Sequence, residues 1–324
     1  MPNQTIKLAI CQKPPVFFNR DATCALALDT LDEASAAGVD LLATPETWLS
    51  GYPVWIDHAP RAGLWGEPGA KALYRLLCES AISKGDATIT ALQNKVDATG
   101  VSLVLGANEL DGGTLYNVQV SLVPGGTPFF HRKLVPTYTE RLIWGMGDGS
   151  TIGVVDAPFG KLGALICWEH WMPLTRAAMH DLGEVVHVAN WPGASEMHHV
   201  ATRHYAFEGG CFAIAAGTVI RKQDLLDGLN SLQADEPDAR AMLEAQETDV
   251  DGYLRRGGSA VFAPDGGVIR DPVYDKIELI TAEVDLSCLT ETKMALDTSG
   301  HYSRPDVFNL TVNTTKQRNV DFVE

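Results

Sequence analysis

Near the middle of the chain runs Gly160-Lys161-Leu162-Gly163-Ala164-Leu165-Ile166-Cys167-Trp168-Glu169-His170-Trp171, the stretch around which the remaining sequence is organised. Small and apolar residues lead straight into a cysteine, and polar and aromatic residues follow at once. This pattern is typical of a buried strand that delivers a thiol to a pocket at its carboxyl end, where open α/β folds place their chemistry. Taken alone, Cys167 is more readily interpreted as a core residue, because free cysteine is among the most buried residue types.

Length and charge exclude several classes of protein. With 324 residues the chain can bury a large core, and 41 acidic against 25 basic residues give a net charge of -16. Such a charge repels phosphate backbones and anionic membranes, so we expect neither a nucleic-acid nor a membrane partner. The amino terminus lacks a signal-peptide pattern, no apolar run is long enough to span a bilayer, and the six cysteines form no CxxC pair. These features predict a soluble, cytoplasmic protein with reduced thiols.

Each half of the chain shows the same order of predicted elements: strand, helix, strand, helix, strand, hairpin. In the first half we expect strands at 8–11, 39–44 and 101–106, helices at 21–37 and 69–99, and a hairpin of 117–123 with 128–133. In the second half we expect strands at 162–166, 184–191 and 211–219, helices at 173–182 and 197–209, a hairpin of 259–263 with 267–270, and a last strand at 278–284. The order predicts an internal duplication.

The predicted fold class is α/β, a four-layer α-β-β-α sandwich formed by a single domain over residues 1–324. Its pseudo-duplicated halves are placed at about 5–150 and 151–290, and two facing sheets would bury the continuous apolar strands on both faces. The acidic segment 222–256 interrupts the repeat and is expected to be a partly helical insertion, either tolerated surface or a lid or subunit contact. The tail at about 300–324 has a strand-like stretch at 307–312 that we expect to pair with another subunit.

Three side chains with complementary chemistry follow predicted strands. Glu46 comes after the second strand, Lys133 ends the first hairpin, and Cys167 follows the first strand of the second half. A thiol is a far better nucleophile as a thiolate, so it needs a base and a nearby positive charge. A carboxylate and a lysine supply both without the histidine of papain-like enzymes. Each residue alone has an ordinary structural interpretation; the set of three predicts nucleophilic catalysis.

Several motifs together resemble the signatures of the nitrilase, or carbon-nitrogen hydrolase, superfamily. They are Pro45-Glu46-Thr47-Trp48 with Gly51-Tyr52-Pro53, the run Arg132-Lys133-Leu134-Val135-Pro136-Thr137-Tyr138-Thr139-Glu140-Arg141, and Gly163-Ala164-Leu165-Ile166-Cys167-Trp168-Glu169-His170. The resemblance extends to Trp144–Ser150, Asn190–Gly193 and His301–Asp306, so it covers nearly the whole chain. Within the superfamily, Cys-Trp-Glu is similar to true bacterial nitrilases, whereas aliphatic amidases tend to carry Cys-Tyr-Asp.

The resemblance implies a role for each matching residue. Glu46 would be the general base, Lys133 the cationic stabiliser, Cys167 the nucleophile, and Glu140 the second glutamate that orients the lysine. It also implies hydrolysis of an aliphatic or arylaliphatic nitrile to the acid and ammonia, with no cofactor or metal, and assembly into a homo-oligomer such as a dimer, spiral or filament. Four aromatic residues next to the predicted strand ends are candidates for binding substrate: Tyr52, Trp55, Trp168 and Trp191.

Three alternatives remain open from the sequence. The nearest is an amidase or N-carbamoyl amidohydrolase of the same superfamily, with the same triad and a different pocket. A metal-dependent hydrolase is suggested by five histidines, but their spacing matches neither HExxH nor a compact ligand set; they are His180, His187, His198, His199 and His204. A non-catalytic assembly scaffold would have no use for Glu46, Lys133 and Cys167 together.

Overall fold

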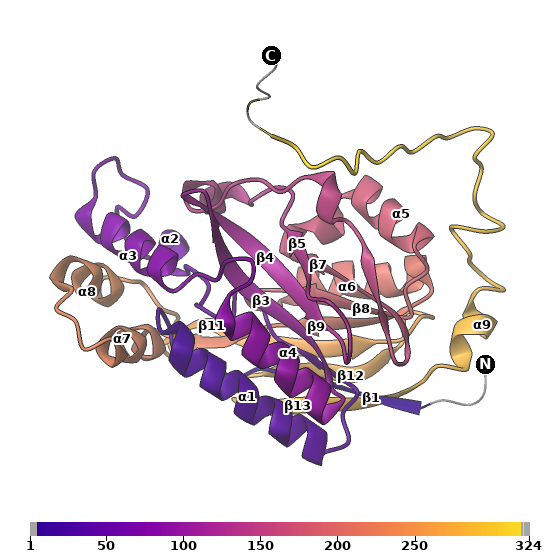
Figure 1. Ribbon diagram of the computed structural model, residues 1–324, viewed down its shortest axis with the longest axis horizontal. Helices are drawn as coiled ribbons and strands as arrows, with labels where there is room; N and C mark the ends of the chain where they lie inside the picture. Colours follow the sequence, from indigo (N-terminus) through magenta and orange to yellow (C-terminus); the bar gives the residue numbers. More distant parts are fainter. Residues whose placement is uncertain (1–4, 319, 321–324) are drawn as a thin grey trace.

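Two β-sheets packed face to face form the centre of the computed structural model, which describes residues 5–318 and 320 (Figure 1). The six-stranded sheet has the order β13-β1-β2-β3-β4-β5. Its strands are β1 (Thr5–Cys11), β2 (Leu41–Ala43), β3 (Ser102–Asp111), β4 (Thr114–Leu122), β5 (Phe129–Arg132) and β13 (Leu279–Asp285). Strands β1, β2 and β3 are parallel, and the flanking pairs are antiparallel.

The seven-stranded sheet repeats this arrangement, with the order β10-β11-β9-β8-β7-β6 and β12 paired to β11. Here β7, β8 and β9 are the parallel strands. The bounds are β6 (Val154–Ala157), β7 (Gly160–Ile166), β8 (Val186–Asn190), β9 (Phe212–Ala216), β10 (Val219–Arg221), β11 (Tyr253–Phe262) and β12 (Val268–Tyr274). Strands β1, β2 and β3 therefore correspond to β7, β8 and β9 in order and direction.

Helices cover the outer face of each sheet and complete the four layers (Figure 1). Helices α1 (Arg20–Ala36) and α4 (Ala87–Thr99) bury an apolar cluster against the six-stranded sheet. Helices α5 (Pro173–Asp181) and α6 (Glu196–Gly209) pack on the outer face of the other sheet. Between the sheets lies a core of alternate strand residues, which include Ile6, Leu8, Ile10, Leu162, Ala164, Val186 and Val188. The predicted fold class is confirmed.

The segment 222–256 holds helices α7 (Lys222–Ser231) and α8 (Pro237–Glu244) and the start of β11. Helix α8 packs on α3 (Pro68–Glu79), where a Cβ added to Gly69 would lie 2.8 Å from Asp238 O. The short elements of the described chain include α2 (Trp55–His58), α9 (Cys288–Thr292) and the 3-10 turns η1 (Tyr138–Leu142), η2 (Gly149–Thr151) and η3 (Cys167–Trp171).

The structure corrects several details of the predicted elements. The last strand, β13, pairs with β1 in the first sheet, so the second half reaches across to complete the first. The predicted strand 211–219 is two strands, because Gly217 and Thr218 separate β9 from β10. Strand β6 is an additional edge strand, paired with β7, that the sequence pattern does not predict. In this single chain the tail segment 307–312 forms no strand, and residues 1–4, 319 and 321–324 lie outside the described residues.

Candidate active site

Cys167 lies at the point where strand β7 gives way to the turn η3. Its backbone φ is +52°, a left-handed value that a non-glycine residue adopts rarely and at a cost of about 1–3 kcal/mol. The side chain is buried, with 3% exposure, yet it lines a cavity. A strained strand-to-helix turn of this kind exposes a nucleophile at the end of a sheet. The local backbone therefore presents the thiol as the sequence predicts.

Glu46 reaches the same place from the end of β2 in the other sheet. Its backbone N–H donates to Trp191 O at 3.2 Å, which ties the loop to the end of β8. The loop crosses directly over Gly106 of β3, where an added Cβ would lie 2.0 Å from Pro45 O. Only glycine at position 106 permits this approach. The close packing fixes the carboxyl group of Glu46 at the interface between the sheets.

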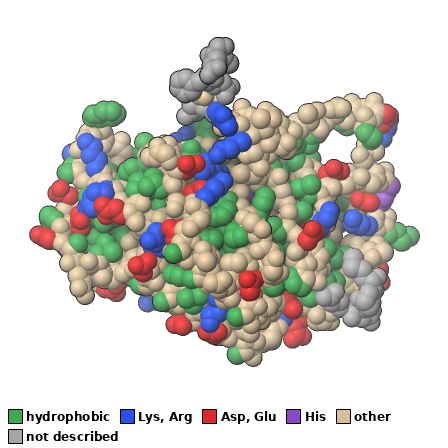
Figure 2. All heavy atoms as spheres, viewed as in Figure 1, with side chains coloured by type: hydrophobic (Ala, Val, Ile, Leu, Met, Phe, Trp, Pro, Cys, Tyr) green, Lys and Arg blue, Asp and Glu red, His purple; other side chains and the backbone are tan. Residues whose placement is uncertain are grey.

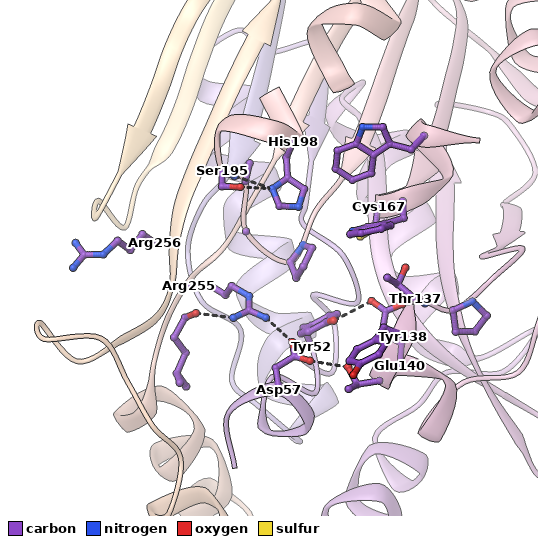
Figure 3. A pocket seen from close by; sticks show the side chains of 18 of the residues that line it. Tyr52, Asp57, Thr137, Tyr138, Glu140, Cys167, Ser195, His198, Arg255 and Arg256 are labelled. Carbon is purple, nitrogen blue, oxygen red and sulfur yellow. Dashed lines mark hydrogen bonds and ion pairs between the residues drawn. The ribbon is translucent and has the colours of Figure 1, made fainter. Parts of the chain in front are cut away.

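Lys133 follows β5 and bridges two buried carboxylates. Its Nζ donates to Glu46 Oε1 at 2.8 Å and to Glu140 Oε2 at 2.6 Å. Asn117 of β4 donates a second hydrogen bond to Glu46 Oε1, at 2.7 Å. Tyr52 donates to Glu140 Oε1 at 2.9 Å, and the pair is visible at the edge of the cavity in Figure 3. The lysine is thus held in one position by charge-assisted hydrogen bonds from both sides.

The thiol lies beside this cluster. One ligand atom from each of Glu46, Glu140 and Cys167 lies within 4.8 Å of the other two. Oxygen Oε2 of Glu46 is buried and has no hydrogen-bond partner among the residues that the structure describes. A carboxylate oxygen with a free lone pair beside a thiol is placed to accept its proton. The three atoms resemble a metal-ligand group, but the ammonium of Lys133 already lies between the two carboxylates and supplies the positive charge.

Burial and charge shift the proton affinities of these groups. Burial raises the pKa of Glu46 to about 7, and the nearby ammonium of Lys133 opposes this only in part. Burial and the Glu46 carboxylate hold the pKa of Cys167 well above its usual range. Burial disfavours the charged form of Lys133, but the surrounding acidic groups outweigh it and raise its pKa. At neutral pH the resting site therefore pairs a neutral thiol with a lysine cation and a base that titrates near neutrality.

Glu169 connects the segments that carry the lysine and the cysteine. Its carboxylate accepts from the backbone N–H of Ile166 at 2.8 Å and of Leu134 at 2.9 Å. His131 lies 3.0 Å from the same group, and the attraction lowers the pKa of Glu169 although burial alone would raise it. The buried pair thus fixes the residue before Cys167 to the residue after Lys133. The sequence predicts no separate role for Glu169 or Asn117. A polar residue in an otherwise buried strand is the signal that points to Asn117.

A cavity of about 1080 Å³ opens in front of the thiol (Figure 3). Cys167, Glu140, Tyr52 and Trp168 line it, whereas Glu46 and Lys133 are buried and are not among the lining residues. Trp168 is 51% exposed and packs edge-on against Trp171, which also lines the cavity. On the far wall, the guanidinium of Arg255 is paired with Asp57 at 2.7 Å.

Two of the four aromatic candidates are placed elsewhere. Trp55 is 1% exposed within an apolar cluster near α3, and Trp191 is fully buried, with its ring N–H donating to Thr202. Neither is among the residues that line the cavity. Both indoles follow strand ends as expected, but they fill the core there. Among the predicted aromatic residues, Tyr52 and Trp168 alone face the space next to the thiol.

Comparison with known proteins decides the family. The model of the carbon-nitrogen hydrolase family matches residues 7–294. The chain belongs to the carbon-nitrogen hydrolase family. It is 36% identical over 323 residues to nitrilase 1 of Arabidopsis thaliana, covering 99% of this chain and 91% of that one. It is 34% identical over 309 residues to an aliphatic nitrilase of Sinorhizobium fredii (strain HH103), covering 95% of each chain.

The fold of this carbon-nitrogen hydrolase also matches solved structures. A Saccharomyces cerevisiae protein, a member of branch 10 of the nitrilase superfamily, aligns with a TM-score of 0.64 and 18% identity. The alignment covers 92% of this chain and 97% of that one. The family model and the relatives of 34–36% identity confirm the family predicted from the motifs, and the protein is a hydrolase acting on carbon-nitrogen bonds. Among the described residues no helix is long and apolar enough to cross a membrane.

Proposed function

We propose that this hydrolase is a nitrilase that converts an aliphatic or arylaliphatic nitrile to the carboxylic acid and ammonia. The observation that carries the proposal is the convergence of Cys167, Glu46, Lys133 and Glu140 at one end of the two sheets, beside an open cavity. The wall of that cavity is largely apolar and aromatic around Trp168, which suits an uncharged organic nitrile.

The first chemical step forms a thioimidate. Glu46 takes the proton of the Cys167 thiol as the sulfur adds to the nitrile carbon, and the electron pair of the broken C–N π bond moves onto nitrogen. A proton then reaches that nitrogen. Lys133 and the backbone N–H of Trp168 stabilise the developing negative charge, a contribution of roughly 3 kcal/mol per well-placed donor. Because the thiol pKa is high, transfer to Glu46 accompanies attack and no thiolate accumulates beforehand.

The remaining steps use two water molecules. The first water, deprotonated by Glu46, adds to the thioimidate carbon; nitrogen is protonated and leaves as ammonia, which gives a thioester. The second water attacks the thioester, the acid is released, and the proton returns to the sulfur of Cys167. Glu140 remains hydrogen-bonded to Lys133 throughout and keeps the ammonium next to the reacting carbon.

A substrate panel tests this proposal. Purified protein is incubated with aliphatic and arylaliphatic nitriles and with the matching amides and N-carbamoyl compounds, and product mass and ammonia are measured. We expect acid and ammonia from at least one nitrile at a rate above that of its amide. Turnover of amides or carbamoyl compounds alone would assign the amidase or carbamoylase alternative, and no turnover of any compound would favour the scaffold. Cys167→Ala is the inactive control.

We also propose that the protein forms a homo-oligomer in the cytoplasm. Helices α5 and α6 expose large apolar side chains, which are Leu174, Met197, Val200 and Phe207. The face in Figure 2 shows apolar side chains interspersed with both acidic and basic ones. The tail after Gly300 runs along the outside, with turns within residues 301–307 and an extended course after them (Figure 1). Light scattering of the full chain and of a variant ending at Ser299 would be informative; a monomer in both would contradict this proposal.

A further inference from the structure

A row of buried polar side chains lies behind the nucleophile, between the seven-stranded sheet and helix α6. Nδ1 of His170 is 2.7 Å from the backbone oxygen of Cys167, and Nε2 of His170 is 2.9 Å from Nε2 of His187. Nδ1 of His187 is 2.6 Å from Oε1 of Glu184, whose other oxygen accepts from the Tyr205 hydroxyl at 2.5 Å. All four side chains are buried, and the proposed chemistry uses none of them.

The partners fix where each proton lies. A backbone carbonyl only accepts, so His170 must carry a hydrogen on Nδ1. With neutral imidazoles, Nε2 of His170 then accepts from Nε2–H of His187, and Nδ1 of His187 must accept in turn. The proton between His187 and Glu184 therefore belongs to the carboxyl group, which is a neutral acid. An ionised Glu184 beside a neutral His187 would reverse every bond and leave a ring nitrogen lone pair facing the oxygen of Cys167.

The electrostatics of these groups agree with this pattern. Burial raises the pKa of Glu184 to about 8, so the carboxyl is protonated at neutral pH. Burial, together with the neighbouring ring of His187, lowers the pKa of His170 to about 3. Burial also holds the pKa of His187 well below its usual range. The titratable groups that face Glu184 include His187 on β8, Tyr205 on α6, Cys211 just before β9 and, at longer range, His180 on α5.

The neighbouring strand provides room for the acid. Gly163 of β7 lies directly beside Glu184, and a Cβ added there would be 1.5 Å from Oε1 of that carboxyl. Any side chain at this point in β7 would displace Glu184 from His187. The stretch that presents Cys167 therefore also contains the glycine that admits the far end of the row.

We propose that His170 is a positioning residue, directed by protonated Glu184 through His187, that fixes the Cys167–Trp168 peptide so that its N–H faces the reacting nitrogen. This inference rests on the proposed function. The oxygen of Cys167 and the N–H of Trp168 belong to one rigid peptide plane and point in opposite directions within it. A donor that holds the oxygen on the buried side therefore sets the direction of the N–H on the cavity side. Cys167 at φ +52° needs such a restraint, because that conformation is unfavourable without support.

Two substitutions of His170 separate the donor from the ring. His170→Phe keeps the ring volume and removes the donor, whereas His170→Asn places an amide N–H near the former Nδ1 and removes most of the ring. We expect His170→Phe to lower kcat on the best nitrile by about 10- to 100-fold, less than complete loss of an oxyanion donor, with KM within about twofold. His170→Asn should recover most of that loss although it melts at a lower temperature. Alkylation of Cys167 by iodoacetamide should proceed at wild-type rate in both.

The opposite pattern overturns the proposal. If activity follows melting temperature, so that His170→Phe is more active than His170→Asn, His170 only packs the core. A rise in KM with kcat unchanged would lead to the same conclusion. Glu184 gives an independent comparison, since Glu184→Gln can still donate to His187 and accept from Tyr205, while Glu184→Ala cannot. Gln should recover most of the kcat that Ala loses; equal losses would contradict a protonated Glu184.

The positions of the protons can also be measured in the wild-type protein, so this test does not depend on the folding of a variant. Nitrogen-15 NMR of the imidazoles should show His170 as the neutral Nδ1–H tautomer and His187 as the neutral Nε2–H tautomer at pH 7. An Nε2–H tautomer for His170 would refute the proton pattern. The two proposals fail in different ways. If the proposed function is wrong, the wild-type protein releases no ammonia from any nitrile, although the tautomers are as described.

Discussion

Replacement of Lys133 by methionine tests the buried charge cluster on which the site depends. The ammonium makes hydrogen bonds of 2.8 Å to Glu46 and 2.6 Å to Glu140, and all three side chains are at most 3% exposed. Methionine fills similar space but leaves two carboxylates facing each other without a cation. Removal of one partner from a buried ion pair typically costs roughly 3–5 kcal/mol, so we expect Lys133→Met to lower the free energy of unfolding by about that amount at pH 8.

The loss should be smaller in mild acid. The pKa of Lys133 is raised in the folded protein, so the ammonium stabilises the fold fully at both pH 5 and pH 8. Any change with pH in the loss caused by Lys133→Met therefore comes from the carboxyl groups. The pKa of Glu46 is already raised to about 7, and at pH 5 the group is protonated, which removes one of the two buried charges. We expect the loss at pH 5 to be about half of that at pH 8.

Urea unfolding followed by circular dichroism at both pH values measures this difference, and ammonia release measures the accompanying fall in kcat, expected to exceed about 1000-fold. The double variant Glu46→Gln with Lys133→Met is the matched control, and its unfolding should differ less between the two pH values. Equal losses at pH 5 and pH 8 in the single variant would refute the charge argument, and retained turnover would remove Lys133 from the mechanism.

Three further predictions concern the neighbours of this cluster. The ionised form of Glu46 is the base, so kcat/KM should rise with pH, with a midpoint at about pH 7. Asn117→Leu removes a hydrogen bond to that carboxylate and should move this midpoint to higher pH by up to about one unit. Gly106→Ala puts a methyl group 2.0 Å from Pro45 O and should lower kcat about 100-fold by displacing the Glu46 loop, as steady-state kinetics would show. Trp168→Ala should change the ratio of kcat/KM values across a nitrile panel, because the indole lines the cavity.

Each of these predictions has its own control and contrary result. Gly63→Ala is the control for Gly106, since its added Cβ meets its nearest atom at 3.6 Å, and it should leave kcat unchanged. If the midpoint of the rise of kcat/KM stays near pH 7 in Asn117→Leu, the Asn117 amide does not stabilise the Glu46 carboxylate. Trp55→Ala is the control for Trp168: it should lower the melting temperature and leave the ratios of kcat/KM alone. A substrate profile unchanged by Trp168→Ala would mean that the indole does not contact substrate.

The sandwich could be predicted because its strands have a clear sequence pattern. Continuous apolar runs such as 101–106 and 162–166 carry the period and length of strands buried on both faces, and their repetition in the same order predicts two equivalent sheets. The last strand of the second half, β13, joins the first sheet beside β1, and local sequence pattern does not record which sheet edge a strand joins. The pairing of the tail segment 307–312 with another subunit stays a prediction, because the segment forms no strand within one chain and β-propensity alone does not supply a partner.

The charged and nucleophilic residues of the candidate site could be predicted from the sequence, whereas the direction of the aromatic rings around it could not. A carboxylate, a lysine and a thiol at strand ends suggest one mechanism, and the structure brings Glu46, Lys133 and Cys167 together. Trp191 occupies an equally suggestive position, but its ring turns into the core, and sequence does not encode that direction. Cys11 ends the strand equivalent to β7, yet its side chain packs under α1 and burial raises its pKa to about 11.

The central claim, that Cys167 attacks the carbon of a nitrile, is tested most directly by mass spectrometry of the protein quenched with acid during turnover of its best nitrile. The account predicts a covalent acyl or imidoyl adduct on the peptide that contains Cys167, present in wild type and absent in Cys167→Ala. Ammonia release with the adduct on another residue, or ammonia release sustained by Cys167→Ala, would contradict it.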